Sequence, residues 1–372
     1  MTYRSVRILI DAREFTASRV TGISHFLEGL ITAATDSSFI QQIVLAVNSC
    51  SYLPSGVKNN HKIITKILPR SFLHSEKILS HLSKQEFQVY ISPYPKLSLF
   101  GIHCPAVHTV HDVLDLTHPA YRKRLKTFID TRRLKKALKK ASLTWFDSRY
   151  SLKETQKYAG YSGANPRVRY PGLDMKFSSR RTKTDGEILN KFNLKPGYIL
   201  VIGNGLPHKN WGVLLKIESR IPRKMVFVGA SGEKKRAWIS LFPQSRATWI
   251  ENIPDADFPS IIRGAFCLAQ PSTAEGYGYP PLEAMACGIP AIVSQIPILK
   301  ETTGGNALFV PPQDPNKWRD AFNKLEEEHI YDNLATKGLR WAEPLKGKKA
   351  WKKHIQDLEE LIKEKFKARD TL

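Results

Sequence analysis

The chain has 372 residues, 42% of them hydrophobic, and its 57 Lys and Arg against 34 Asp and Glu give a formal net charge of +23. This length predicts two or three domains with a real core, and the ordinary hydrophobic content excludes wholesale disorder and a collagen-like chain. No stretch reaches the roughly 18 apolar residues of a membrane-spanning helix, and the first apolar run, residues 8–10, is too short for a signal peptide. The positive charge favours anionic partners: nucleic acid, acidic lipid or phosphorylated ligands.

Short apolar runs alternate with helical patterns along the first half of the chain. The expected strands are residues 6–11, 43–47, 62–68, 88–92, 106–111 and 143–147. The expected helices between them are residues 21–34, 72–82 and 121–141. Apolar residues that recur at helical spacing define these helices. Such alternation predicts parallel strands joined by crossover helices, and therefore a doubly wound α/β sheet.

The same alternation restarts in the second half. The expected strands are residues 198–202, 225–228, 266–269 and 291–294, and the expected helices are 213–217, 258–264 and 281–286. The polar segment 177–195 between the two series predicts an interdomain linker. We therefore predict two similar domains, 1–176 and 190–345. An amphipathic helix at about 350–372 is expected to pack back toward the first domain. Ligands of such sheets bind at the carboxyl ends of the strands, so the functional residues should lie in loops that follow strands.

The most informative loop spans residues 271–288. It follows an expected strand, contains Gly276-Tyr277-Gly278 and enters a helix through a Pro pair, which suits the first helical turn. Backbone N–H groups of residues 276–279 at the helix N-terminus predict a phosphate site. Glu275 precedes the turn and Glu283, expected in the first helical turn, follows it. Their carboxylates can accept hydrogen bonds from sugar and ribose hydroxyls, although Glu283 can also simply complement the helix dipole.

With seven residues between them, Glu275 and Glu283 resemble the E-x7-E motif of retaining family-4 glycosyltransferases of GT-B fold. Other segments resemble this family in the same order, across residues 6–320. They are Asp11-Ala12-Arg13, Thr21-Gly22-Ile23, Thr109-Val110-His111-Asp112, and the segments 147–151, 170–174 and 203–210. The resemblance is closest to bacterial transferases that build O-antigen and other surface polysaccharides, many of them mannosyltransferases. It implies two Rossmann-like domains that face a central cleft.

The resemblance also implies a role for each matching residue. Glu275 contacts the donor sugar close to the reacting carbon, Glu283 holds the nucleotide ribose, and Lys209 neutralises the leaving diphosphate. From the first domain, His111 meets the donor sugar, and Gly22 lets the backbone approach the β-phosphate because it has no Cβ. The remaining expected donor-binding residues are Gly203, Asn204, Gly276, Tyr277 and Gly278.

One position departs from the family pattern. Many relatives place an Arg before the Lys of the phosphate loop, where this chain has Asn204-Gly205 and then His208. Neutralisation of the phosphate therefore rests on Lys209 alone or on an Arg from elsewhere. Fixed N–H donors and a Lys stabilise the charge that develops on the leaving phosphate. The resemblance implies front-face attack with retention and no dedicated base.

Two weaker patterns suggest metal sites, and we expect no metal and no other cofactor. Asp255-Ala256-Asp257 looks like the metal-binding D-x-D of another glycosyltransferase fold, but it precedes an expected helix, where Asp is a favoured cap. His103, Cys104 and His108 lack a fourth ligand in register. The cysteines, at positions 50, 104, 267 and 287, show no paired spacing and are expected to be reduced thiols. A different pair, His111 and the adjacent Asp112, is not expected to form a dyad, because neighbours on a strand point to opposite faces.

Residues 121–141 carry ten Lys and Arg against the single acid Asp130. Apolar residues at helical spacing, among them Leu125, Phe128 and Ile129, are expected on one side of this helix. Two interpretations stay open. The helix can expose a solvated outer face, or it can bind an anionic membrane surface. In the second case each basic residue near the surface contributes about 1 kcal/mol to the free energy of binding.

We therefore expect a retaining, metal-independent glycosyltransferase. It would move a hexose, by preference mannose, from GDP-mannose or a UDP-sugar to a glycan or lipid-linked acceptor in bacterial surface polysaccharide synthesis. We expect it in the cytoplasm at the inner face of the cell membrane, with no nucleic-acid partner. The alternative is a basic nucleic-acid- or membrane-binding protein with an inactive GT-B fold.

Overall fold

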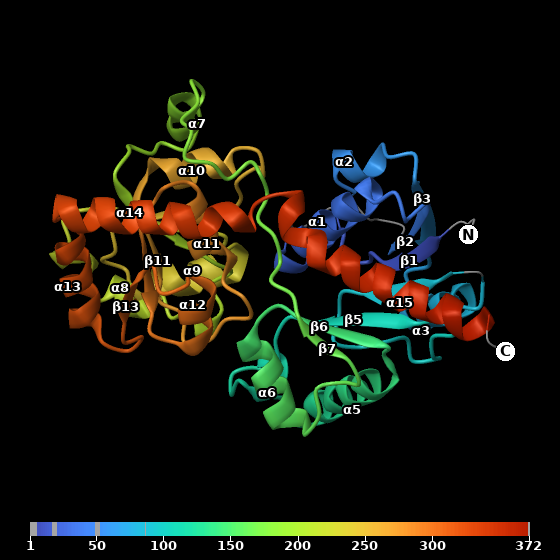
Figure 1. The fold of residues 1–372 in the computed structure, drawn as a ribbon. Helices are drawn as coiled ribbons and strands as arrows, with labels where there is room; N and C mark the ends of the chain where they lie inside the picture. Colours follow the sequence, from blue (N-terminus) through green and yellow to red (C-terminus); the bar gives the residue numbers. More distant parts are fainter. Residues whose placement is uncertain (1–5, 17–20, 49–52, 86, 371–372) are drawn as a thin grey trace. The chain divides into compact units, whose positions relative to one another are not determined.

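The computed structural model describes residues 6–16, 21–48, 53–85 and 87–370, and it divides the chain into two compact units. Unit 1 comprises residues 1–172 and 347–372, and unit 2 comprises residues 173–346 (Figure 1). The last helix of the chain therefore belongs to the unit that begins it. Within the described residues, no helix is long and apolar enough to cross a membrane.

Unit 1 is built on a seven-stranded parallel sheet of order β3-β2-β1-β4-β5-β6-β7. Its strands are β1 (Arg7–Asp11), β2 (Gln42–Asn48), β3 (Ile63–Leu68), β4 (Val89–Ser92), β5 (Ala106–Val110), β6 (Leu143–Phe146) and β7 (Pro166–Val168). Its helices are α1 (Gly22–Asp36), α2 (Ser55–Lys58), α3 (Phe72–Leu82), α4 (Leu114–Thr117), α5 (Arg124–Lys140), α6 (Arg149–Ala159), the 3-10 turn η4 (Lys348–Trp351) and α15 (Lys352–Asp370). The strand order reverses direction between β1 and β4, which is the switch point of a doubly wound sheet.

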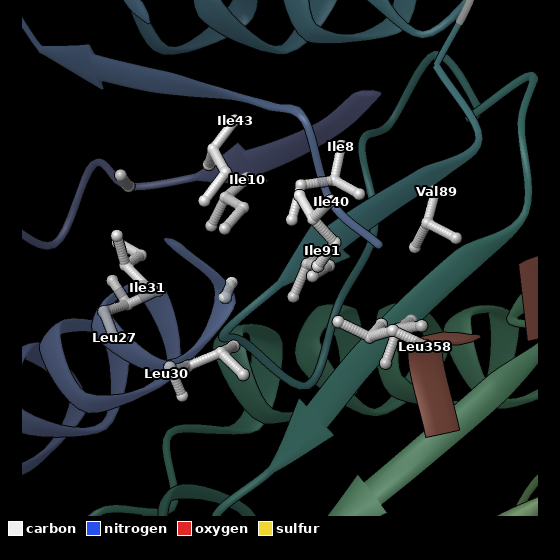
Figure 2. Close-up of a cluster of buried hydrophobic side chains, with 14 of the residues drawn as sticks. Ile8, Ile10, Leu27, Leu30, Ile31, Ile40, Ile43, Val89, Ile91 and Leu358 are labelled. Carbon is white, nitrogen blue, oxygen red and sulfur yellow. The ribbon is translucent and has the colours of Figure 1, made fainter. Parts of the chain in front are cut away.

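The main core of unit 1 joins the start of the chain to its end. Figure 2 shows isoleucines of β1 and β4, the apolar side of α1 and Leu358 of α15 in one buried cluster. Trp351, 3% exposed, fills the space left by two glycines, because a Cβ at Gly29 or Gly172 would lie 2.4 or 2.5 Å from its ring. Asp357 of α15 accepts a hydrogen bond from the Trp145 indole at 2.9 Å. These contacts fix α15 on unit 1.

Unit 2 repeats the design with a six-stranded parallel sheet of order β10-β9-β8-β11-β12-β13. Its strands are β8 (Tyr198–Ile202), β9 (Met225–Val228), β10 (Thr248–Ile250), β11 (Ala265–Gln270), β12 (Ala291–Ser294) and β13 (Leu308–Val310). Its helices are α7 (Asp185–Lys191), α8 (Gly212–Leu215), α9 (Gly232–Leu241), α10 (Phe258–Gly264), α11 (Tyr279–Ala286), α12 (Pro297–Thr302), α13 (Pro315–Leu325) and α14 (Glu328–Ala342), with 3-10 turns η1 (Pro207–Lys209), η2 (Glu218–Arg220) and η3 (Glu343–Leu345). The two predicted doubly wound sheets are confirmed.

The prediction of a linker at residues 177–195 is wrong. This segment belongs to unit 2 and contains α7, which packs against α10. Asp185 of α7 accepts hydrogen bonds from Arg263 at 2.6 Å and from Ser260 at 2.8 Å. The Arg263 guanidinium holds the pKa of Asp185 well below its usual range. A polar composition suggested exposed chain, but an ion pair between largely buried side chains anchors this segment instead.

Candidate active site

Two loops of unit 2 follow the adjacent strands β8 and β11, between which the strand order reverses. Loop 203–210 follows β8 and loop 271–278 follows β11, so both leave the carboxyl edge at the switch point, where doubly wound sheets bind ligands. The Thr273 N–H donates to the His208 carbonyl at 2.8 Å. The Asn210 amide, on a residue with φ of 52°, donates to the Pro271 carbonyl at 2.9 Å. The two loops are therefore held together.

Lys209 and Glu275 meet at this junction. The ammonium group of Lys209 donates to both carboxylate oxygens of Glu275, at 2.8 and 2.9 Å. The aliphatic part of Lys209 lies over Gly203, where an added Cβ would be 3.2 Å from the Lys209 Cγ and Cδ atoms. A glycine at position 203 thus lets the lysine lie flat and reach the carboxylate.

Glu275 is ionised in this arrangement. Burial raises its pKa, but the Lys209 charge and hydrogen bond outweigh burial, so the pKa lies below its ordinary value. The Gln270 amide also donates a hydrogen bond to this carboxylate. The structure therefore places a carboxylate and an ammonium group, each expected to act on the donor, in one ion pair.

Glu283 has a different environment. It is the fifth residue of α11, so the expectation that it lies in the first helical turn is wrong. It is 6% exposed, and burial raises its pKa to about 8. In the described part of the chain, no group donates a hydrogen bond to it. The effect of a helix dipole falls off within the first turn, so the dipole interpretation does not account for this residue. A buried carboxyl without a partner is suited to bind the hydroxyls of a ligand.

The glycine turn of loop 271–278 has a conformation that needs glycine. Gly278 occupies the N-cap position of α11 with φ of 87°, which side chains rarely adopt. A Cβ there would also lie 2.7 Å from a methyl carbon of Leu299. Beside it, Tyr277 is buried and its ring meets that of Tyr279 edge to face. Gly276 lies between Glu275 and Tyr277, and Asn204 accepts a hydrogen bond from the Leu206 N–H in the other loop.

His111 follows β5 in unit 1 and is bound through both ring nitrogens. Its Nδ1 lies 2.6 Å from an Asp147 carboxylate oxygen and its Nε2 lies 2.8 Å from the Pro93 carbonyl. Both partners only accept, so the ring must donate twice and carry a positive charge. Burial lowers the pKa of His111, but the Asp147 charge outweighs it, and the pKa lies above its ordinary value.

Sequence reasoning missed Asp147 as the partner of His111. β5 and β6 are adjacent, and Val110 lies opposite Phe146. The residues that directly follow them, His111 and Asp147, therefore also lie side by side. Comparing residues that follow neighbouring strands would have found the pair.

Gly22 begins α1, directly after the capping residue Thr21.

A second missed residue of unit 1 is Glu14. Its carboxylate accepts hydrogen bonds from the Thr21 hydroxyl at 2.6 Å and the Tyr94 hydroxyl at 3.1 Å. The three side chains come from the loops that follow β1 and β4, the two strands at the switch point of this sheet.

We expect Asp147→Asn to remove the charge of His111 at neutral pH. The raised pKa keeps the ring protonated above its ordinary pKa of 6.5, and without the carboxylate burial lowers that pKa. A histidine-selective NMR titration measures the change directly. His108, whose pKa burial lowers to about 3, serves as the internal control and should stay neutral in both proteins. An unchanged His111 titration in Asp147→Asn would contradict this account. The pair stabilises the fold below pH 6.5 and this contribution disappears as pH rises through the folded-state pKa.

The suspected metal ligands have other partners. Asp257 is at the N-cap position of α10, but its side chain makes no capping hydrogen bond and pairs with Lys191 at 2.7 Å. Asp255 pairs with Lys176. Across the described ranges, no three His, Cys, Asp or Glu side chains gather as a metal site requires. The thiols at positions 104, 267 and 287 are unpaired, and Cys50 lies outside the described residues.

The family of unit 2 follows from its sequence. Residues 187–339, which contain both site loops, match the model of glycosyl transferases group 1. The chain carries a glycosyl transferases group 1 domain. O-antigen chain mannosyltransferase B of Escherichia coli is 27% identical over 294 residues, which are 75% of this chain and 76% of that protein. O-antigen chain mannosyltransferase RfbU of Salmonella typhimurium is 30% identical over 139 residues, 36% of this chain and 39% of that protein. Residues 187–339 therefore have the sequence of a glycosyltransferase domain.

Solved structures show the same fold at low sequence identity. Sucrose-phosphate synthase of Thermosynechococcus elongatus superimposes with a TM-score of 0.77 at 18% identity, covering 98% of this chain and 100% of that one. Anabaena HepE, in complex with UDP and glucose, gives a TM-score of 0.73 at 14% identity, covering 99% and 100% of the two chains. The chain therefore has the GT-B fold.

Proposed function

We propose that this protein is a glycosyltransferase that moves a mannosyl residue from a nucleotide-sugar donor to a glycan or lipid-linked glycan in O-antigen synthesis, with retention and without a metal. The O-antigen mannosyltransferases named above support the sugar and the product class. The observation that carries the proposal is the Lys209–Glu275 ion pair at the β8–β11 switch point. GDP-mannose is our preferred donor and a UDP-sugar the alternative.

The ion pair suits the departure of a nucleoside diphosphate. Glu275 holds the ammonium group of Lys209 in place. With donor bound, this ammonium group turns to the diphosphate, and the N–H groups at the start of α11 bind the same phosphates. The ionised Glu275 then accepts hydrogen bonds from the sugar hydroxyls. These fixed charges stabilise negative charge on the leaving phosphate oxygen without reorganisation during the reaction.

Retention follows from attack on the face that the leaving group occupies. The bond from the sugar C1 to the phosphate oxygen breaks, and the bond from C1 to the acceptor oxygen forms. The acceptor proton passes to the leaving phosphate, which departs as the nucleoside diphosphate. Glu275 keeps the hydrogen bond from Gln270 and accepts hydrogen bonds from the sugar hydroxyls, so it is held to bind hydroxyls and not to act as a free base.

We expect the nucleotide to bind more tightly as pH rises toward about 8. Burial raises the pKa of Glu283 to about 8, and its ionised form accepts hydrogen bonds from both ribose hydroxyls. Below this pKa the carboxyl must lose a proton on binding, which costs about tenfold in affinity per pH unit. Thermal shift measurements with GDP, UDP and dTDP across pH provide the test. Glu283→Gln, which cannot ionise, should bind weakly and show no such pH dependence.

The same measurement separates an enzyme from a basic nucleic-acid-binding protein. A nucleotide at a hundred times its Kd stabilises the folded state by about 2.7 kcal/mol. An oligonucleotide should give only a salt-sensitive shift. If none of the nucleoside diphosphates raises the melting temperature, the proposed donor site is wrong.

We propose that the reaction takes place at the cytoplasmic face of the cell membrane, where a lipid-linked acceptor is presented. The high positive charge of the chain supports this location, because that face carries anionic lipid.

A further inference from the structure

The apolar residues of α5 lie on two opposite faces of the helix and not on one side as the sequence suggested. Leu134, Ala137 and Leu138 are buried against unit 1, together with Thr127. Leu125, Phe128 and Ile129 instead point away from this face and are 74, 56 and 48% exposed. A solvated outer face of a core helix has no reason to carry three neighbouring large apolar side chains. We call these three residues and the basic residues around them the outer face of α5.

Most of the basic residues between positions 121 and 141 form no ion pair with an acidic residue in the described structure. Of the ten Lys and Arg between residues 121 and 141, only Lys126 and Arg133 form ion pairs within the described structure, with Asp115, Asp130 and Glu76. The other eight are Arg122, Lys123, Arg124, Arg132, Lys135, Lys136, Lys139 and Lys140. The Arg132 guanidinium lies over the Phe128 ring at 4.9 Å. Unpaired cations thus surround an apolar centre.

A cavity and a second apolar pair extend this surface. At the start of α5, a cavity of about 630 Å³ is lined by Arg122, Arg124, Phe128 and Tyr158, among others. It places two guanidinium groups, neither paired to a carboxylate, beside two aromatic rings. Midway along α5, Arg133 lies over the ring of Phe72, 5.6 Å from its centre. Phe72 and the adjacent Leu73 of α3 are 49 and 59% exposed.

We propose that the outer face of α5 docks on an anionic lipid bilayer. Leu125, Phe128 and Ile129 enter the boundary between headgroups and acyl chains, and the surrounding Lys and Arg bind lipid phosphates. Arg122 and Arg124 are placed to hold one such phosphate at the cavity. A large apolar patch within a basic rim, with almost no acid, matches the interface of a membrane with negative headgroups. The outer face of α5 is the surface that the proposed membrane location requires, and its role does not depend on the donor site in unit 2.

Sedimentation with lipid vesicles tests this surface. The full-length protein should bind vesicles that contain phosphatidylglycerol, should not bind vesicles of phosphatidylcholine alone, and should be released by high salt. The double variant Leu125→Glu/Phe128→Glu should lose roughly tenfold or more of its binding, because it places charge at the apolar centre. Both side chains are exposed, so we expect the fold to be retained.

Leu241→Glu is the matched control. Leu241 lies on α9 of unit 2, is 68% exposed, and its substitution places a glutamate at an exposed apolar position elsewhere, with half of the charge that the double variant adds. This variant should bind vesicles almost like the unchanged protein. Equal binding by the double variant, or no binding of the unchanged protein to anionic vesicles at low salt, would overturn the proposal. So would salt-insensitive binding to neutral vesicles. Nucleotide thermal shifts on the same variants report the donor site separately, so the two proposals fail independently.

Discussion

Replacing either Lys209 or Glu275 by Ala is expected to abolish measurable sugar transfer. Lys209 is the cation placed to stabilise the leaving phosphate, and Glu275 both positions this cation and binds the donor sugar. Loss of one such fixed stabilising group costs about 3–4 kcal/mol of barrier, or about a hundred- to a thousandfold in rate. Release of nucleoside diphosphate in the presence of acceptor measures the effect. Transfer at the unchanged rate by both variants would show that the site lies elsewhere.

The burial of this pair adds a stability effect that the assay must control. Lys209 and Glu275 expose only 13 and 7% of their side chains, and removing one partner leaves the other charge buried and unpaired. Breaking a buried pair in this way costs about 3–5 kcal/mol. The double variant Lys209→Met/Glu275→Gln removes both charges and should unfold close to the unchanged protein while remaining inactive. A stable, inactive double variant separates loss of chemistry from loss of fold.

The second large effect is expected from Trp351→Ala, which should lower the free energy of unfolding of unit 1 by about 3–5 kcal/mol. Its ring is buried against Phe26 and fills the space over Gly29 and Gly172. Removal leaves a cavity where the segment leading into α15 packs on the main core of unit 1. Urea unfolding monitored by circular dichroism measures the loss, with unit 1 and unit 2 treated as separate transitions.

Lys352→Ala is the control for Trp351. It changes the adjacent, exposed residue of the same segment and should alter stability by less than about 0.5 kcal/mol. An unfolding midpoint that is the same for Trp351→Ala and for Lys352→Ala would contradict the packing of the last helix on unit 1.

Both sheets could be predicted from sequence because buried parallel strands form nearly continuous apolar runs. β8, for example, has the bounds expected from its apolar residues. Helices that bury few or no side chains completely were not recognised. α6 buries only Ser151 and Thr155, and no residue of α9 is fully buried. α7 was taken for a linker because its composition is polar, it buries the single side chain of Leu189, and its ion pair with Arg263 cannot be recognised from the sequence.

The sequence predicted the two loops that form the candidate site, but it did not predict the contacts between their side chains. The motif around Glu275 marked one loop and Lys209 the other, but 66 residues separate these two side chains and only the order of β8 and β11 brings them together. The His111–Asp147 pair depends in the same way on the adjacency of β5 and β6. The two faces of α5 depend on which side packs on unit 1, and helical spacing alone does not specify that side.

The most direct test of the central claim is donor turnover by the purified protein. The protein is incubated with GDP-mannose, or with a UDP-sugar, and a lipid-linked glycan acceptor, and release of nucleoside diphosphate is measured together with the anomeric configuration of the product. We predict acceptor-dependent release with retained configuration, and its loss in Glu275→Ala. Release that is equal in Glu275→Ala, or a product of inverted configuration, would contradict the assignment of the Lys209–Glu275 pair.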